Sequence, residues 1–125
     1  MAHILLIDDD EQFRGMLSQM LLQDNHKVAV AVDGEEGLRL ALQLRPDLIV
    51  TDILMPRKDG IETIMALAAA GSTIPVIAIS GGRRSISADF NLESATLVGV
   101  KATLAKPFAR NDLREAIMRA LGALS

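Results

Sequence analysis

Short apolar runs alternate with longer amphipathic stretches five times along this chain. The runs occupy residues 4–7, 28–31, 48–50, 76–79 and, more weakly, 102–105. Several of them are apolar at every position, which is typical of parallel strands that are covered on both faces. A strand followed by a helix, repeated five times, predicts an α/β domain with a doubly wound parallel sheet and helices on both sides.

The stretches between the runs carry apolar residues at helical spacing. The predicted core-facing stripes are Phe13, Met16, Leu17, Met20 and Leu21; Leu38, Ala41 and Leu42; Ile61, Ile64, Met65 and Ala68; and Leu113, Ala116, Ile117, Ala120, Leu121 and Leu124. The pattern at residues 87–98 is the least regular. Asp33 with Glu36, and Asp59 with Glu62, have the spacing of a capping box and mark two helix starts.

The bulk composition fits one globular domain. The 125 residues can bury a real core, and because no linker or repeat divides them we expect residues 1–125 to form one unit. A net charge of -3 argues against broad nucleic-acid binding, which needs a basic surface. The lack of cysteine excludes disulfides and thiolate metal sites. The first apolar run is too short for a signal peptide or a membrane span, so we expect a cytoplasmic location.

Polar residues follow four of the predicted strands at their carboxyl ends. They are Asp8, Asp9 and Asp10 after the first strand, Asp52 after the third, Ser80 after the fourth and Lys106 after the fifth. Taken singly, each has a plainer explanation as a helix cap, a turn residue or a solvated side chain. Neighbouring strands lie about 4.8 Å apart and parallel strands end at one edge of a sheet, so together these groups are expected to converge.

Such a convergence predicts a particular chemistry. Carboxylates that meet repel one another unless a cation neutralises them. Mg²⁺ suits an all-oxygen site and keeps water positions that a phosphate oxygen can take. Lysine adds a positive charge and serine a hydroxyl donor for a phosphoryl group, while an ionised aspartate can itself be the nucleophile. The sequence therefore predicts a magnesium site at which one of these carboxylates can accept a phosphoryl group.

Over essentially its full length, the chain resembles the receiver domain of response regulators in two-component signalling. The motifs that carry this resemblance are Ile-Leu-Leu-Ile-Asp-Asp-Asp at 4–10, Pro-Asp-Leu-Ile-Val-Thr-Asp-Ile-Leu-Met-Pro at 46–56 with Asp59-Gly60 following, Pro-Val-Ile-Ala-Ile-Ser at 75–80, and Lys-Pro-Phe at 106–108. The resemblance implies a flavodoxin-like (βα)5 fold with strand order 2-1-3-4-5. It also implies that a histidine kinase or a histidine phosphotransfer protein phosphorylates Asp52.

The resemblance further implies a metal site. Asp9 and Asp52 would bind Mg²⁺ directly, Asp8 would act through water, and the backbone carbonyl of Leu54 would complete the protein ligands. Asp10 would be an additional acidic residue outside the ligand set.

The remaining roles concern the phosphoryl group and the signal. Lys106 would contact the phosphoryl group through a loop with a cis bond to Pro107, and Ser80 would be the switch hydroxyl that moves toward the phosphate. Phe13 would be a core residue.

Two features depart from the family pattern. Thr103 stands three residues before Lys106, where relatives usually have a Tyr, Phe or His that rotates during signalling. Residues 81–90 make a longer loop that begins with two glycines, and this is either a tolerated surface insertion or a segment that reports phosphorylation and selects partners. We expect the signal to pass to a partner through the loop after Ser80 and the fourth helix, without the family's usual coupling of hydroxyl and aromatic ring.

Two other functions remain open. A receiver-like interaction module that is never phosphorylated is one of them, because Thr103 replaces the switch aromatic. The other is a phosphohydrolase of the haloacid-dehalogenase type, which Asp8-x-Asp10 superficially matches, although Gln12 stands where that family has Thr or Val. The favoured prediction is a signalling phosphoacceptor and not an enzyme, one that catalyses only its own phosphorylation and dephosphorylation. It would bind a downstream protein, with no nucleic-acid or membrane partner, as a stand-alone receiver or as part of a longer regulator.

Overall fold

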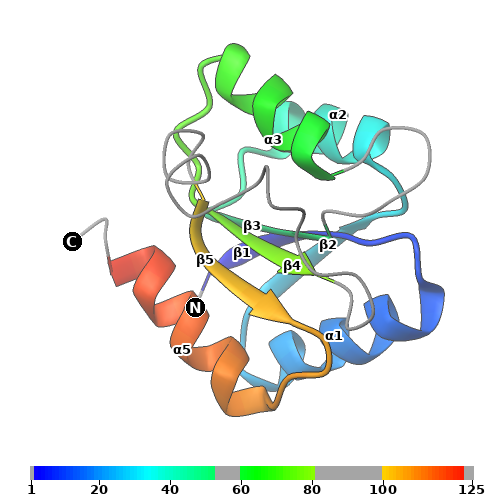
Figure 1. The fold of residues 1–125 in the computed structure, drawn as a ribbon, viewed down its shortest axis with the longest axis vertical. Coiled ribbons are helices and arrows are strands. Elements are labelled where there is room, and N and C mark those ends of the chain that lie inside the picture. The colour runs from blue at the N-terminus through cyan, green and yellow to red at the C-terminus, as the bar shows by residue number, and fades with distance from the viewer. Residues whose placement is uncertain (1, 53–59, 81–99, 123–125) are drawn as a thin grey trace.

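The computed structural model describes residues 2–52, 60–80 and 100–122. Within these ranges the chain forms one five-stranded parallel sheet with the strand order β2-β1-β3-β4-β5 (Figure 1). The strands are β1 (His3–Ile7), β2 (Lys27–Ala31), β3 (Leu48–Asp52), β4 (Val76–Ser80) and β5 (Val100–Ala105). The predicted fold class, strand order and strand positions are confirmed.

Helices cover both faces of the sheet. The described helices are α1 (Glu11–Gln23), α2 (Gly34–Leu44), α3 (Gly60–Ala69) and α5 (Arg110–Gly122). Figure 1 shows α1 and α5 on one side of the sheet and α2 and α3 on the other. The helix predicted near residues 87–98 lies outside the described residues. None of the described helices is both long and apolar enough to cross a membrane.

The apolar residues of β1 explain why this strand does not alternate. Ile4 and Leu6 belong to the core beneath α1 and α5, whereas Leu5 and Ile7 belong to the core beneath α2 and α3. All four side chains are fully buried. A central parallel strand therefore needs an apolar residue at every position, as its sequence has.

The predicted helical stripes are correct at their centres and partly wrong at their edges. Leu17 and Leu21 of α1 are fully buried, but Met16 is 47% exposed. In α3 the core-facing residues include Thr63 and Leu67 besides the predicted Ile64. A helix touches the sheet along a narrow strip, so a residue at the edge of an apolar stripe can point past the sheet into solvent.

Other residues that the stripes predicted to face the core are exposed for the same reason. Leu42 and Met65 are 49% and 57% exposed, and Ala68 is also exposed. In α5 the predicted Leu113, Ala116, Ile117 and Ala120 are buried, and Leu124 lies outside the described residues.

The start of α2 confirms one predicted cap. The Glu36 backbone N–H donates to Asp33 Oδ1 at 2.8 Å, and Glu36 Oε1 accepts from the Val32 N–H at 3.1 Å. One turn later, Gly37 packs directly on Ile7, where an added Cβ would lie 2.8 Å from Ile7 Cγ1. Only glycine allows α2 to approach β1 this closely. The second predicted cap, at Asp59, lies outside the described residues.

Candidate functional site

Three carboxylates meet at the carboxyl edge of the sheet. Asp8 follows β1, and Asp52 is the last residue of β3. The parallel register pairs Ile7 with Thr51, so Asp8 and Asp52 are brought side by side one position later. Oxygen atoms of Asp8, Asp9 and Asp52 all lie within 4.8 Å of one another. Asp8 and Asp52 are buried, whereas Asp9 is exposed at the open side of the cluster.

Lys106 joins this cluster from the loop after β5. Its Nζ lies 3.1 Å from Asp52 Oδ2 and 3.5 Å from Asp8 Oδ2. The residues are 54 and 98 positions apart in the sequence, so only the parallel sheet brings them together. The Lys106 side chain is 20% exposed, so it is mostly shielded from water.

The loop between β1 and α1 is fixed by its own hydrogen bonds. Asp10 caps α1, because its Oδ1 accepts from the N–H groups of Gln12 and Phe13 at 3.0 and 3.2 Å. The Asp10 N–H in turn donates to Asp8 Oδ1 at 2.8 Å. Asp10 therefore orients the helix and the Asp8 carboxylate.

The electrostatics of the cluster are unfavourable for a further anion but favourable for a cation. Burial raises the pKa of Asp8, and the charges of Asp52 and Asp9 add to this, although the Asp10 N–H and Lys106 oppose it. Burial lowers the pKa of Lys106, but its hydrogen bonds and charge interactions with Asp52 and Asp8 outweigh burial, so that its pKa lies above the usual value. When ionised, three carboxylates and one ammonium leave an excess of negative charge at this edge.

The donor atoms fit magnesium better than a softer metal. All of them are carboxylate oxygens, which are the ligands that Mg²⁺ prefers, and the exposed Asp9 leaves an open side where water or a phosphate oxygen can bind. Asp8, Asp9 and Asp52 are thus the described residues that could hold such an ion.

The other predicted site residues have different outcomes. Ser80 is the last residue of β4 and pairs with Ala105, so its backbone lies at the same edge, one position from Lys106. Leu54 lies outside the described residues. The Lys106–Pro107 bond is cis, as the resemblance implies. Thr103 is half-buried in β5.

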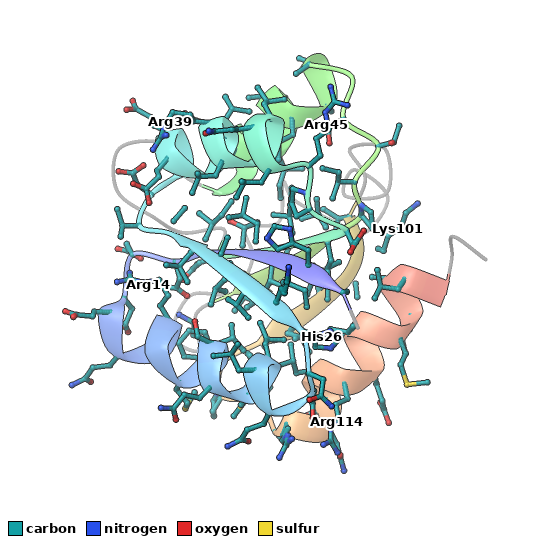
Figure 2. The ribbon with its side chains drawn as sticks, turned by 180° about the vertical axis from the view of Figure 1, so that it is seen from behind. Arg14, His26, Arg39, Arg45, Lys101 and Arg114 are labelled. Carbon is teal, nitrogen blue, oxygen red and sulfur yellow. The ribbon has the colours of Figure 1, made fainter. Side chains whose placement is uncertain are left out.

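Two residues at this edge were not predicted to contribute to the site. Arg14, on the first turns of α1, donates from Nη1 to the backbone oxygen of Asp8 at 2.8 Å (Figure 2). Phe13 places its ring 3.9 Å, centroid to Nζ, from the ammonium of Lys106. Their position in the first turns of the helix after the acidic run could have indicated that they lie near the site. Phe13 was predicted as a core residue because it is apolar and has helical spacing.

Comparison with known proteins gives one consistent result. Residues 4–118 match the family model of the response regulator receiver domain. The response regulator MprA of Mycolicibacterium vanbaalenii is 37% identical over 120 residues, which are 96% of this chain and 50% of that protein. The chain therefore spans about half the length of the curated relatives that it matches.

Solved structures agree with this result. The chemotaxis protein CheY4 of Vibrio cholerae superposes with a TM-score of 0.84 at 29% identity, covering 97% of this chain and 99% of that one. The receiver domain of the sensor histidine kinase PA1611 of Pseudomonas aeruginosa superposes with a TM-score of 0.81 at 28% identity, covering 97% and 98%. That structure has a magnesium ion coordinated in its active-site cleft.

Proposed function

The chain belongs to the receiver-domain family of two-component response regulators, and on this premise we propose that it accepts a phosphoryl group on Asp52 in a magnesium-dependent reaction. The observation that carries the proposal is the meeting of Asp8, Asp9 and Asp52 with the ammonium of Lys106 at one edge of the sheet. A cluster of this charge needs a cation and provides a nucleophile and a fixed positive group beside it.

Each side chain has a distinct role in the proposal. Asp9, Asp52 and the carbonyl of Leu54 would hold Mg²⁺ directly and Asp8 would do so through water. The ion would neutralise the carboxylates and the incoming phosphoryl oxygens. Lys106 holds a further phosphoryl oxygen from the β5 side, because its Nζ already contacts Asp52.

The chemical step needs no general base. An ionised Asp52 oxygen forms a bond to phosphorus while the bond between phosphorus and the donor's imidazole nitrogen breaks, and the imidazole leaves with that electron pair. The protein contributes position and charge, which are the main contributions to catalysis of phosphoryl transfer.

The output of the domain is proposed to start at Ser80. Its backbone lies at the site edge beside Lys106, and a hydroxyl there can bind a phosphoryl oxygen. The signal would then reach a downstream protein through the loop after Ser80 and the fourth helix. Thr103 has no ring to rotate, so this route differs from the aromatic switch of the family.

The partners follow from the same chemistry. A sensor histidine kinase or a histidine phosphotransfer protein would supply the phosphoryl group in the cytoplasm. The receiver domain is proposed to extend over residues 1–125, somewhat beyond the matched residues 4–118. It would act as a signalling phosphoacceptor that turns over only its own acyl phosphate.

One experiment tests the acceptor. The protein is incubated with acetyl phosphate and Mg²⁺, and its intact mass is measured. We expect a single added phosphoryl group that hydroxylamine removes, as an acyl phosphate requires, and that is absent when a chelator is present.

The control is Asp52→Asn, which keeps the size of the side chain but removes the nucleophilic charge. This variant should gain no phosphoryl group. An adduct that persists in Asp52→Asn would show that another residue is the acceptor.

A further inference from the structure

The ammonium of Lys106 lies over an aromatic ring. Its Nζ is 3.9 Å from the centroid of the Phe13 ring and 3.1 Å from Asp52 Oδ2. A cation within about 6 Å of a ring face is attracted by the negative face of the π system. Phe13 is half-buried and packs against the core as predicted, but this contact is made with the charged group of the site.

The Phe13 ring is itself held from two directions. The backbone N–H of Phe13 donates to Asp10 Oδ1 in the cap of α1, and this hydrogen bond fixes the backbone from which the ring projects. The ring of Phe108 meets it edge to face, with centroids 5.8 Å apart and planes at 85°. Phe108 stands two residues after Lys106, so the loop after β5 supplies both the ammonium and a support for the ring beneath it.

The flexible side chain of a lysine must be held in one position if its ammonium is to act at such a site, and the ring can help to hold it. Its ammonium is a point charge on a flexible four-carbon chain, and ordering that chain costs conformational entropy. Asp52 Oδ2 and Asp8 Oδ2 accept from the ammonium on one side. A ring face attracts the charge without competing as a strong hydrogen-bond acceptor, so the N–H donors stay directed at the carboxylates.

We propose that Phe13 is a positioning residue for Lys106, whose ring holds the ammonium where it contacts Asp52 and thereby sets the rate at which Asp52 takes up a phosphoryl group. This inference rests on the function proposed above. It assigns to Phe13 an electrostatic role that the packing of an aliphatic residue of similar size would not supply.

The first measurement reads the geometry without phosphorylation. The side-chain methylene protons of Lys106 are assigned by NMR in the metal-free protein, with chelator present. A ring current from Phe13 should displace those nearest the ammonium upfield, and Phe13→Leu should remove the displacement. Unchanged shifts in Phe13→Leu would overturn the proposal.

The second measurement weakens the ring's charge attraction without changing its shape. Phe13 is replaced site-specifically by phenylalanines with one, two and three ring fluorines, and the rate constant of phosphorylation by acetyl phosphate is measured at saturating Mg²⁺. The rate should fall progressively, to about one third for the trifluorinated ring. The Mg²⁺ concentration for half-saturation should stay the same, since the ring acts on the ammonium of Lys106, which is not a metal ligand.

The same fluorine series at Phe108 is the matched control, because no cation contact is found for that ring among the described residues. It should change the rate distinctly less. A flat series at Phe13, or equal slopes for the two rings, would overturn the proposal while leaving phosphorylation of Asp52 intact. Absence of any adduct on the unsubstituted protein would overturn both this inference and the proposed function.

Discussion

The two ends of α1 each carry a buried or half-buried aspartate, and the two are perturbed in opposite directions. Asp8, just before the helix, has a raised pKa, mainly because it is buried and because Asp52 and Asp9 lie nearby. Asp24, the C-cap residue, has a pKa held far below its usual value by hydrogen bonds from Arg114 and Arg110. Figure 2 shows Arg14 near the start of this helix and Arg114 near its end.

The second end is an ion-pair network. Arg110 Nη2 lies 2.6 Å from Asp24 Oδ1, and Arg114 binds both oxygens of Asp24, at 2.8 and 3.1 Å. Both arginines belong to α5, so the pair of bridges ties α5 to the end of α1. Two guanidinium groups more than balance one carboxylate, and they also lie at the negative end of the α1 dipole.

The difference separates a structural bridge from a binding site. At Asp24 the two arginines already balance the charge of the carboxylate, so this aspartate needs no added cation. At Asp8 and Asp52 the described cation that contacts the carboxylates is Lys106, while Arg14 donates to the backbone oxygen of Asp8. The three carboxylates still leave negative charge that favours an added divalent ion. Aspartate thus stabilises the fold at one end of the helix and forms part of a candidate metal site at the other.

The largest expected effect concerns the metal. Asp9→Ala should weaken Mg²⁺ binding by at least about tenfold, because it removes a charged ligand. Lys106→Ala should bind Mg²⁺ as well as the unsubstituted protein or better, because it removes a competing cation. Titration calorimetry measures both, and it suits a chain that has neither Trp nor Tyr as a fluorescent reporter.

Glu115→Ala is the matched control, since it removes an exposed carboxylate on α5 away from the cluster. It should leave the affinity unchanged. If Lys106→Ala lost as much affinity as Asp9→Ala, the ammonium would belong to the metal site and the charge comparison would be wrong.

A smaller effect, with opposite signs at the two ends, is expected in stability. In the metal-free protein Asp8→Asn should stabilise the fold by roughly 0.5–2 kcal/mol, as substitutions that relieve a strained functional site commonly do. Asp24→Asn should destabilise it, because two guanidinium groups lose their partner. Urea unfolding followed by circular dichroism gives both values.

Saturating Mg²⁺ is the control for this pair. It should stabilise the unsubstituted protein by mass action and thereby reduce or reverse the advantage of Asp8→Asn, with no such change for Asp24→Asn. If both substitutions shifted stability in the same direction without metal, the contrast between the two ends would fail.

The smallest effects lie in the pH dependence of those differences. Asp24, with its lowered pKa, binds fewer protons folded than unfolded, so its contribution is present above about pH 4 and lost as the pH falls below it. Asp8, with its raised pKa, binds more protons folded, so the cost of ionising it arises only as the pH rises above about 4. Unfolding curves between about pH 3 and about pH 7 should therefore show the Asp8→Asn difference shrinking toward zero at the acidic end. The Asp24→Asn difference should only begin to shrink there, because the folded pKa of Asp24 lies far below its usual value. Differences that stay constant with pH would mean that neither carboxyl titrates as described.

The sequence predicted the sheet and most of the site because both depend on local patterns that repeat. Apolar runs such as Leu48 to Val50 specify a buried strand, and a residue at the carboxyl end of a parallel strand, such as Asp52, must lie at one known edge. The edges of the helical stripes were less predictable. Met16 and Met65 have the right spacing, but whether a side chain touches the sheet depends on how the helix is rotated and tilted on it.

What the sequence determined by itself, then, was that Asp8, Asp9 and Asp52 stand at the carboxyl ends of their strands, because parallel strands end at one edge of the sheet. The tertiary structure alone decided the contacts that the sequence had not predicted at the two ends of α1, namely the ring of Phe13 beside the ammonium of Lys106 and the two arginines at Asp24. Lys106 reaches over Phe13 to Asp52, and Arg110 and Arg114 reach Asp24. These contacts join residues far apart in the chain through flexible side chains, so the packing of α1, α5 and β5 determines them and no local pattern records them.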